Sequence, residues 1–152
     1  MTTPKRALLL EDNEGVNDFL TNTLNEYGYE VFHFSSPAVC PLQLYPECRC
    51  DENERCVEII ISDLEMPLID GLTFVENQRI KGCKAPYIAL ASSNWDMQKL
   101  VRATELECKS FVKPFKMLEL YNWLDEIENE INLNRKLANW FNESNDKVLS
   151  NE

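Results

Sequence analysis

The sequence lacks any hydrophobic run long enough to cross a membrane. Its longest apolar stretches, such as residues 7–10 and 59–61, are far shorter than the roughly 20 residues that a spanning helix needs. Residues 1–6 also lack the apolar segment of a secretory signal peptide. We therefore expect no membrane association and a cytoplasmic location.

Basic residues are scarce in this chain. Its 152 residues include 15 lysines and arginines against 26 aspartates and glutamates, which gives a net charge of −11. A surface that negative repels the phosphate backbone of nucleic acids, so we expect no direct nucleic-acid binding. The only histidine, His33, lies in a predicted strand, where we expect a packing role instead of that of a phosphate donor or metal ligand.

The chain also lacks internal repeats and has no Gly/Ser-rich linker before its last polar residues. Hydrophobic residues at 44% and charged residues at 27% are near the average of folded proteins, which excludes a disordered or collagen-like chain. A single domain usually has about 100–200 residues. We therefore expect one domain over residues 1–141 and a polar tail over residues 142–152.

Apolar stretches of strand length alternate with amphipathic stretches of helix length, which is typical of βα units around a parallel sheet. We expect helices at about 14–27, 72–80, 96–106 and 115–141, and a short one that Pro41 and Pro46 interrupt. The fold class is then α/β, a five-stranded doubly wound parallel sheet with helices on both faces and an extended last helix. The predicted strands are residues 7–10, 30–34, 57–61, 87–91 and 110–112.

Charged side chains follow three of the predicted strands. Glu11 and Asp12 come after the first strand, Asp63 after the third and Lys113 after the fifth. The carboxyl ends of parallel strands meet at one edge of the sheet, where three carboxylates would raise one another's pKa unless a cation lay among them. Mg²⁺ prefers oxygen ligands and leaves positions open for phosphate. The pattern therefore predicts a site that handles a phosphoryl group, with an aspartate as nucleophile.

Three motifs around this site resemble those of one protein family. The segment Ile-Ser-Asp-Leu-Glu-Met-Pro-Leu-Ile-Asp-Gly at residues 61–71 resembles the phosphoacceptor loop of two-component response-regulator receiver domains. Leu-Glu-Asp-Asn at residues 10–13 resembles their acidic pair, and Lys-Pro-Phe at residues 113–115 completes the set. The resemblance covers roughly residues 5–130 and implies a flavodoxin-like sheet with the strand order 2-1-3-4-5.

The resemblance implies a role for each matching residue. Asp63 would accept phosphate from the phosphohistidine of a sensor histidine kinase or phosphotransfer protein, and Lys113 would pair with that phosphate. Pro67 and Gly71 would shape the loop, and Pro114 would follow a cis peptide bond that aims Lys113 inward. Mg²⁺ would be held by acidic side chains and one backbone carbonyl: Asp12 directly, Glu11 through water, the Asp63 carboxylate and the carbonyl of Glu65.

Two positions of the family pattern can each be matched to two different residues of this sequence. Receiver domains carry a serine or threonine at the end of the fourth strand and a switch aromatic on the fifth. If residues are counted forward from Pro86, Ala91 is in the hydroxyl position. If they are counted back from Lys113, with an allowance for a fifth strand that is one residue shorter than usual, Ser92 is in that position. The same allowance makes Phe111 the switch aromatic, and without it Ser110 takes that place. We favour Ser92 and Phe111 as the phosphate-binding and switch residues, because a hydroxyl and an aromatic are then both present.

An insertion at about residues 40–56 departs from the family pattern and is rich in cysteine. Its four thiols could hold zinc or an iron–sulfur cluster, form a disulfide or redox pair, or be inert. The spacing lacks the Cys-x-x-Cys pairs of a typical metal site, and neighbouring carboxylates would raise the thiol pKa values. Cys83 and Cys108 are expected to be small buried hydrophobic residues. The four thiols of the insertion are Cys40, Cys48, Cys50 and Cys56.

The last predicted helix bears on how the protein would signal. Its apolar residues follow a four-three spacing that could form a coiled-coil homodimer, or its first half could pack on the sheet and leave a solvated tail. The apolar series is Leu120, Leu124, Ile127, Ile131, Ala138 and Phe141.

The leading hypothesis is a receiver that controls a partner protein or relays phosphate, with no enzymatic activity beyond its own phosphotransfer and dephosphorylation. One alternative is the amino-terminal piece of a longer regulator. A weaker one is an aspartate-nucleophile phosphatase, which would need a general acid that the sequence does not show.

Overall fold

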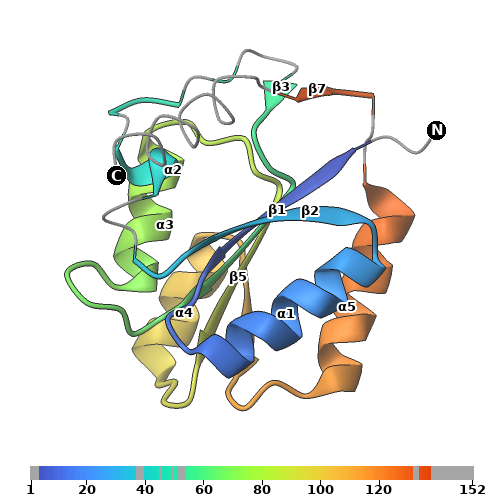
Figure 1. Cartoon of the computed structure of the whole chain (residues 1–152). Coiled ribbons are helices and arrows are strands. Elements are labelled where there is room, and N and C mark those ends of the chain that lie inside the picture. The colour runs from blue at the N-terminus through green and yellow to red at the C-terminus, as the bar shows by residue number, and fades with distance from the viewer. Residues whose placement is uncertain are drawn as a thin grey trace.

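The computed structural model describes residues 4–36, 40–44, 46–48, 50, 54–131 and 134–137. Its main sheet has five parallel strands in the order β2-β1-β4-β5-β6 (Figure 1). Counted within this sheet alone, the order is 2-1-3-4-5, so the predicted fold class is confirmed. The strands are β1 (Lys5–Leu10), β2 (Tyr29–Phe34), β4 (Ile59–Asp63), β5 (Tyr87–Ser92) and β6 (Cys108–Val112).

Helices cover both faces of this sheet. Figure 1 shows α1 (Glu14–Glu26) and α5 (Met117–Glu130) on one side, and α3 (Gly71–Ile80) and α4 (Met97–Glu105) on the other. Helix α2 (Pro41–Leu44) is a single short turn, as the prolines around it predict. Within the described part of the chain, no helix is long and apolar enough to span a membrane.

Short polar side chains determine where three of the helices begin. Asn13, Asp70 and Asp96 each accept a hydrogen bond from the backbone N–H three residues on, at 3.0, 2.7 and 2.8 Å. These bonds satisfy amides that the first helical turn leaves without a partner. Because each cap lies in the loop after a strand, α1, α3 and α4 all start near the carboxyl edge of the sheet.

The central strand β4 is buried on both faces, as its apolar sequence predicts. Ile59 and Ile61 belong to the core under α1 and α5, whereas Ile60 belongs to the core under α3 and α4. All three are at most 2% exposed. Strand β4 begins two residues later than predicted and extends to Asp63, so the predicted phosphoacceptor is its last residue.

The last helix is shorter than predicted. Helix α5 ends at Glu130 and the chain is extended at Ile131, so a helix over 115–141 is wrong. Leu120, Leu124 and Ile127 are buried in the sheet core and are not available for a coiled-coil seam. Beyond it, β7 (Lys136–Leu137) pairs in parallel with β3 (Glu54–Arg55) of the insertion. Residues 138–152 lie outside the described residues.

A buried ion pair accounts for the end of α5 and the extended chain after it. The guanidinium of Arg135 pairs with the carboxylate of Glu58, and these side chains are 4% and 0% exposed. Arg135 Nη2 also donates to the carbonyl oxygen of Pro4 at 2.6 Å, and Glu58 Oε2 accepts the backbone N–H of Arg6 at 2.8 Å. Residues 134–137 thus form a strap across the amino ends of β1 and β4.

Replacing Arg135 with methionine should strongly destabilise the protein, because Glu58 would remain as a buried charge without its cation. We expect a loss of about 3–5 kcal/mol in the free energy of unfolding. The matched control is Arg102→Met, whose ion pair with Glu76 is 44% exposed on both sides and should contribute less than about 1 kcal/mol. Equal losses in urea denaturation would contradict the structural role of the strap.

Candidate functional site

The carboxyl edge of the sheet gathers the charged residues that the sequence singles out. Glu11 follows β1, Asp63 ends β4 and Lys113 follows β6. The Lys113 Nζ lies 3.0 Å from Glu11 Oε2 and also pairs with Asp63 Oδ1. One carboxylate oxygen each from Glu11, Asp12 and Asp63 lies within 4.8 Å of the other two. Asp12 is exposed, whereas Glu11 and Asp63 are 3% and 4% exposed.

Burial and like charge shift the proton affinities of this cluster. Burial and a hydrogen bond with Glu11 raise the pKa of Asp63 to about 8, although Lys113 acts against this shift. Burial also acts to raise the pKa of Glu11, but hydrogen bonds from Asp63, the Asn13 amide and Lys113 outweigh it and lower the value. Burial alone would lower the pKa of Lys113, yet its bonds to Asp63 and Glu11 raise it. Burial and the neighbouring Glu11 therefore favour the protonated form of Asp63.

These residues fit a hard divalent cation. The convergence of three carboxylates with only one lysine leaves excess negative charge, and a cation would take the place of the proton on Asp63. In the described part of the chain, this acidic group is the only set of three or more such side chains with the spacing of a metal site.

The loop after β4 is held close to Asp63. Gly71 N–H donates to the carbonyl oxygen of Leu64 at 2.7 Å. A Cβ atom at Gly71 would collide with the backbone carbonyl oxygen of Asp63 and lie 2.8 Å from a methyl carbon of Leu90. Glycine is therefore required by close packing at this point. Pro67, the other residue predicted to shape this loop, is exposed and its carbonyl accepts the Ile69 N–H at 2.9 Å.

The peptide bond between Lys113 and Pro114 is cis, which confirms that prediction. The hydroxyl of Ser92 is bonded to Glu65 and to the backbone of Asn94. It donates to Glu65 Oε1 at 2.6 Å and accepts the Asn94 N–H at 2.9 Å. The strand register instead places Ala91 beside Asp63.

Phe111, the predicted switch aromatic, lies in the core of the sheet. Its side chain is 1% exposed and packs against Phe115 and Trp123, with ring centroids 5.5 Å away in each case, in the core under α5. The role of Phe111 as the switch aromatic stays a prediction. The half-buried Trp95 of the β5–α4 loop donates its indole N–H to the Phe111 carbonyl at 2.8 Å. This bond joins the β5–α4 loop to β6.

His33 is also closer to the site than its sequence position indicates. Its Nε2 lies 2.7 Å from the carbonyl oxygen of Glu11, at the end of the neighbouring strand. This contact fixes the backbone next to the acidic pair. The expectation of a packed strand residue is therefore only partly met, because the side chain is exposed.

The cysteine insertion folds onto the opposite side of the sheet from α5. Lysine side chains at the end of α3 tie its backbone in place: Lys81 donates to the carbonyl oxygens of Leu42 and Gln43, and Lys84 to that of Cys50. Cys40, Cys50 and Cys56 are buried in the core under α3 and α4, and Cys48, Cys83 and Cys108 pack against it.

This environment does not support zinc or an iron–sulfur cluster. The thiols are free, and no three of those in the described part of the chain come together with the spacing of a metal site. Burial raises the pKa of Cys40 to about 12 and of Cys83 to about 11, and contact with Cys50 together with burial raises that of Cys48 further. Metals bind thiolates, and burial in the apolar core disfavours the thiolate form, although the charges of Lys81 and Lys84 act against this shift.

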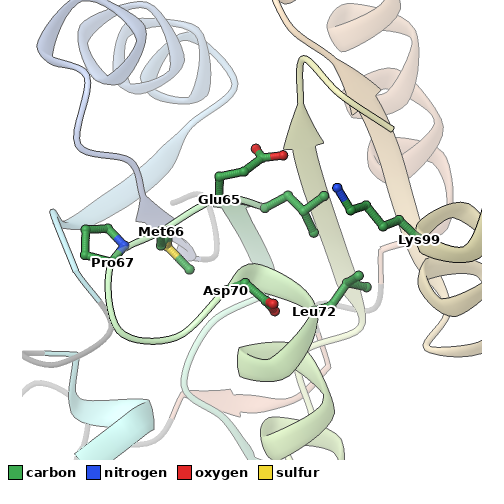
Figure 2. Close-up of a pocket in the computed structure, with 7 residues that line it drawn as sticks. Glu65, Met66, Pro67, Asp70, Leu72 and Lys99 are labelled. Atoms are coloured by element: carbon green, nitrogen blue, oxygen red, sulfur yellow. The ribbon is translucent and has the colours of Figure 1, made fainter. Parts of the chain in front are cut away.

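Two cavities adjoin the acidic cluster. One of about 410 Å³ lies between the β4–α3 loop and α4, and Figure 2 shows Glu65 and Lys99 on different sides of it. The other, of about 660 Å³, lies between the start of α1 and the β6–α5 loop, and its lining includes Asn13, Phe19 and Lys113.

Comparison with known proteins identifies a similar sequence family and a similar fold. Residues 7–125 match the family model described as the response regulator receiver domain. A protein of a Picosynechococcus strain, described as a probable transcriptional regulatory protein, is 24% identical over 120 residues, which are 79% of this chain and 47% of that protein. The chain thus spans about half the length of this curated relative.

Solved structures with the same fold include two receiver proteins. The non-phosphorylated HemR receiver domain of Leptospira biflexa superposes with a TM-score of 0.67 at 24% identity, covering 84% of this chain and 97% of that one. The chemotaxis protein CheY4 of Vibrio cholerae gives a TM-score of 0.64 at 23% identity, covering 82% and 98%.

Gly71→Ala should destabilise the protein and distort the loop, because the new methyl group meets fixed backbone. We expect a loss of about 1–3 kcal/mol in unfolding free energy. Gly15→Ala is the matched control, because its Cβ would have no neighbour closer than 3.5 Å and alanine favours the helix by about 1 kcal/mol. Thermal denaturation of both variants tests the contrast, and a stable Gly71→Ala protein would contradict the close packing.

Asp63→Asn should stabilise the metal-free protein increasingly as the pH rises. The pKa of Asp63 is about 8 in the folded state against 3.8 for the ordinary group, so the folded state keeps a proton that the unfolded chain releases between these values. This contribution to stability is complete below pH 3.8 and is lost as the pH rises through about 8. Between pH 5 and pH 9, the variant should gain about 2 kcal/mol or more over the wild type in EDTA. A difference that does not vary with pH would refute the buried proton, and saturating Mg²⁺ should reduce the gap by stabilising the wild type.

Proposed function

Because this chain belongs to the response-regulator receiver family, we propose that it accepts a phosphoryl group on Asp63 and controls a partner protein in two-component signalling. The observation that carries the proposal is the arrangement at the carboxyl edge of the sheet. Asp63 ends the central strand, Lys113 pairs with it, and Glu11 and Asp12 lie within 4.8 Å. Receiver domains as a family interact with histidine kinases and downstream effectors.

The acidic cluster is the proposed Mg²⁺ site. Asp12, Asp63 and the backbone carbonyl of Glu65 would bind the ion directly, and Glu11 would act largely through water. Asp12 is exposed to solvent, so the site is open on the side where phosphate would arrive. When bound, the ion supplies positive charge that offsets the charge of the transferred phosphoryl oxygens.

Asp63 is the proposed nucleophile. Its carboxylate oxygen would attack phosphorus, forming an O–P bond while the P–N bond to the donor histidine breaks and the imidazole leaves. Lys113 would pair with a phosphoryl oxygen, a role that its present ion pairs with Asp63 and Glu11 favour. The raised pKa of Asp63 means that deprotonation must come first, which cation binding promotes.

The cavity beside α1 is the proposed approach for the phosphohistidine donor. It opens next to Lys113 and is lined by Val16, Phe19 and Phe115. An apolar cleft of this kind fits a helix of a kinase or phosphotransfer protein that carries the histidine at its surface.

The proposed contact with the output partner lies on the α4 side. Met97, Val101 and Val112 are 74%, 47% and 57% exposed, although they are large and apolar. Exposed apolar side chains that cluster on one face are typical of protein interaction sites. We favour this face over a homodimer through the last helix, because Leu120, Leu124 and Ile127, which would form the coiled-coil seam, are buried in the core.

Acetyl phosphate with Mg²⁺ should add one phosphoryl group to the wild type and none to Asp63→Asn, because the carboxylate nucleophile is lost. The readout is the mass of the intact protein at several times after mixing. Asp70→Asn is the matched control, since this aspartate lies in the same loop and serves as a helix cap. Equal labelling of the wild type and Asp63→Asn would refute the assignment.

A further inference from the structure

Two cysteines of the insertion are held on the loop that follows α3. The backbone N–H of Cys48 donates to the carbonyl oxygen of Lys81 at 3.1 Å, and the Lys84 ammonium group donates to the carbonyl oxygen of Cys50 at 2.6 Å. Both anchors belong to the same short loop, so Cys48 and Cys50 keep their places relative to each other.

The side chains of Cys48 and Cys50 also contact each other. Their thiols share a hydrogen bond, and both side chains pack in the core under α3 and α4. A disulfide needs Cβ atoms about 3.5–4.5 Å apart, and thiols that already touch are suited to this geometry. Cys48 is half-buried and Cys50 is 7% exposed, so the pair lies at the boundary of the core, where a small solute can reach it.

This pair fits a disulfide although it does not fit a metal. A structural metal site needs several ionised sulfurs, and burial opposes the thiolate form. A disulfide needs only two sulfurs, carries no charge and has no polar hydrogen. The apolar surroundings that oppose a bound metal are therefore compatible with a disulfide.

The contact gives the two thiols different roles. The hydrogen bond with Cys50 raises the pKa of Cys48, and burial and the charge of Cys50 act in the same direction. Cys48 therefore keeps its proton when Cys50 has lost its own, and its S–H group donates to the Cys50 sulfur. The Lys84 ammonium group, bonded to the Cys50 carbonyl, adds a positive charge beside the pair. Cys50 is thus the attacking thiol, and Cys48 is the thiol that closes the bond.

We propose that Cys48 and Cys50 form a reversible disulfide when the protein meets a hydroperoxide. The Cys50 thiolate attacks an oxygen of the peroxide, the O–O bond breaks, and Cys50 becomes a sulfenic acid. The released alkoxide or hydroxide takes up the proton that Cys50 had lost. The Cys48 sulfur then attacks the Cys50 sulfur, the S–O bond breaks, and the hydroxide leaves as water with the proton of Cys48. The two sulfurs together lose two electrons, which reduce the peroxide.

The disulfide favours the form in which the insertion is docked on the loop after α3. A closed ring restricts the opened segment more than the docked one. Because α3 starts near the carboxyl edge of the sheet and the pair lies at its other end, this chemistry takes place away from Asp63. The inference does not rest on the proposed phosphorylation, and the pair is a second modification site.

The test treats the reduced full chain with hydrogen peroxide, blocks the remaining thiols with N-ethylmaleimide and maps the peptides by mass spectrometry. We expect the wild type to lose two of its six free thiols and to form one bond between Cys48 and Cys50. Dithiothreitol should restore both thiols, because it reduces a disulfide but not a sulfinic or sulfonic acid. Cys108→Ser is the matched control, since it removes a half-buried cysteine outside the insertion and should leave the bond unchanged.

Variants of the pair separate the two roles. Cys48→Ser should stop the reaction at the sulfenic acid, so that dimedone labels Cys50. Cys50→Ala should give neither the bond nor a dimedone adduct at Cys48, because the attacking thiol is absent. Dimedone labelling of Cys48 in Cys50→Ala, with none of Cys50 in Cys48→Ser, overturns the assignment of the attacking thiol.

Cys83 is the competing partner. Burial raises its pKa to about 11, and the nearby Cys48 and Cys50 act in the same direction. Cys83→Ser should still form the bond between Cys48 and Cys50. A bond from Cys83 to either thiol, or a mixture of pairings in the folded protein, overturns the proposal. So does the absence of thiol loss in the folded protein at a peroxide concentration that oxidises the chain unfolded in urea.

Discussion

Two buried carboxylates beside a single ammonium group constrain the rest of this structure. Glu11 and Asp63 are drawn together by the ends of β1 and β4, and Lys113 is the basic partner that the structure gives them. One positive charge does not balance two buried negative charges, so the pKa of Asp63 is raised. The parallel ladder holds the backbones in place against this repulsion. A cation or a phosphoryl group would change the charge at the same point, which links metal binding to phosphorylation.

The rigidity of the loop after β4 limits which groups can respond to that change. Gly71 packs against the Asp63 backbone without space for a methyl group, and Asp70 caps α3. Displacing this backbone would disrupt both contacts. Exposed side chains of the loop can move without displacing this backbone. One of them is Glu65, whose carboxylate accepts a hydrogen bond from the Ser92 hydroxyl. The response is therefore expected to pass through side-chain hydrogen bonds before it reaches α4.

The resemblance to receiver domains implied the strand order of the sheet, which the structure confirms. The grouping of Glu11, Asp12, Asp63 and Lys113 could be predicted from their positions at the ends of strands, because a parallel sheet brings these ends together. The sequence did not predict the end of α5. Helical periodicity alone does not show that Arg135 must reach the buried Glu58, which is far away in the sequence. The environment of Phe111 and the hydroxyl partner of Ser92 were missed for a similar reason. The face of the strand on which each side chain lies and the packing around it determine both features, and a comparison of sequence motifs contains neither kind of information.

The strap at residues 134–137 encloses the sheet at the end opposite to the acidic cluster. Its pairing of Lys136 with Glu54 joins segments that are distant in the chain, so its contacts are costly in loop-closure entropy and are expected to form late in folding. Short strands of this kind open by local fluctuation at a lower free energy than a central strand. Backbone amides of β7 should then exchange with deuterium well before those of β4. The two-stranded sheet of the strap and the five-stranded sheet would thus differ in lifetime, with the chemistry located on the slowly exchanging one.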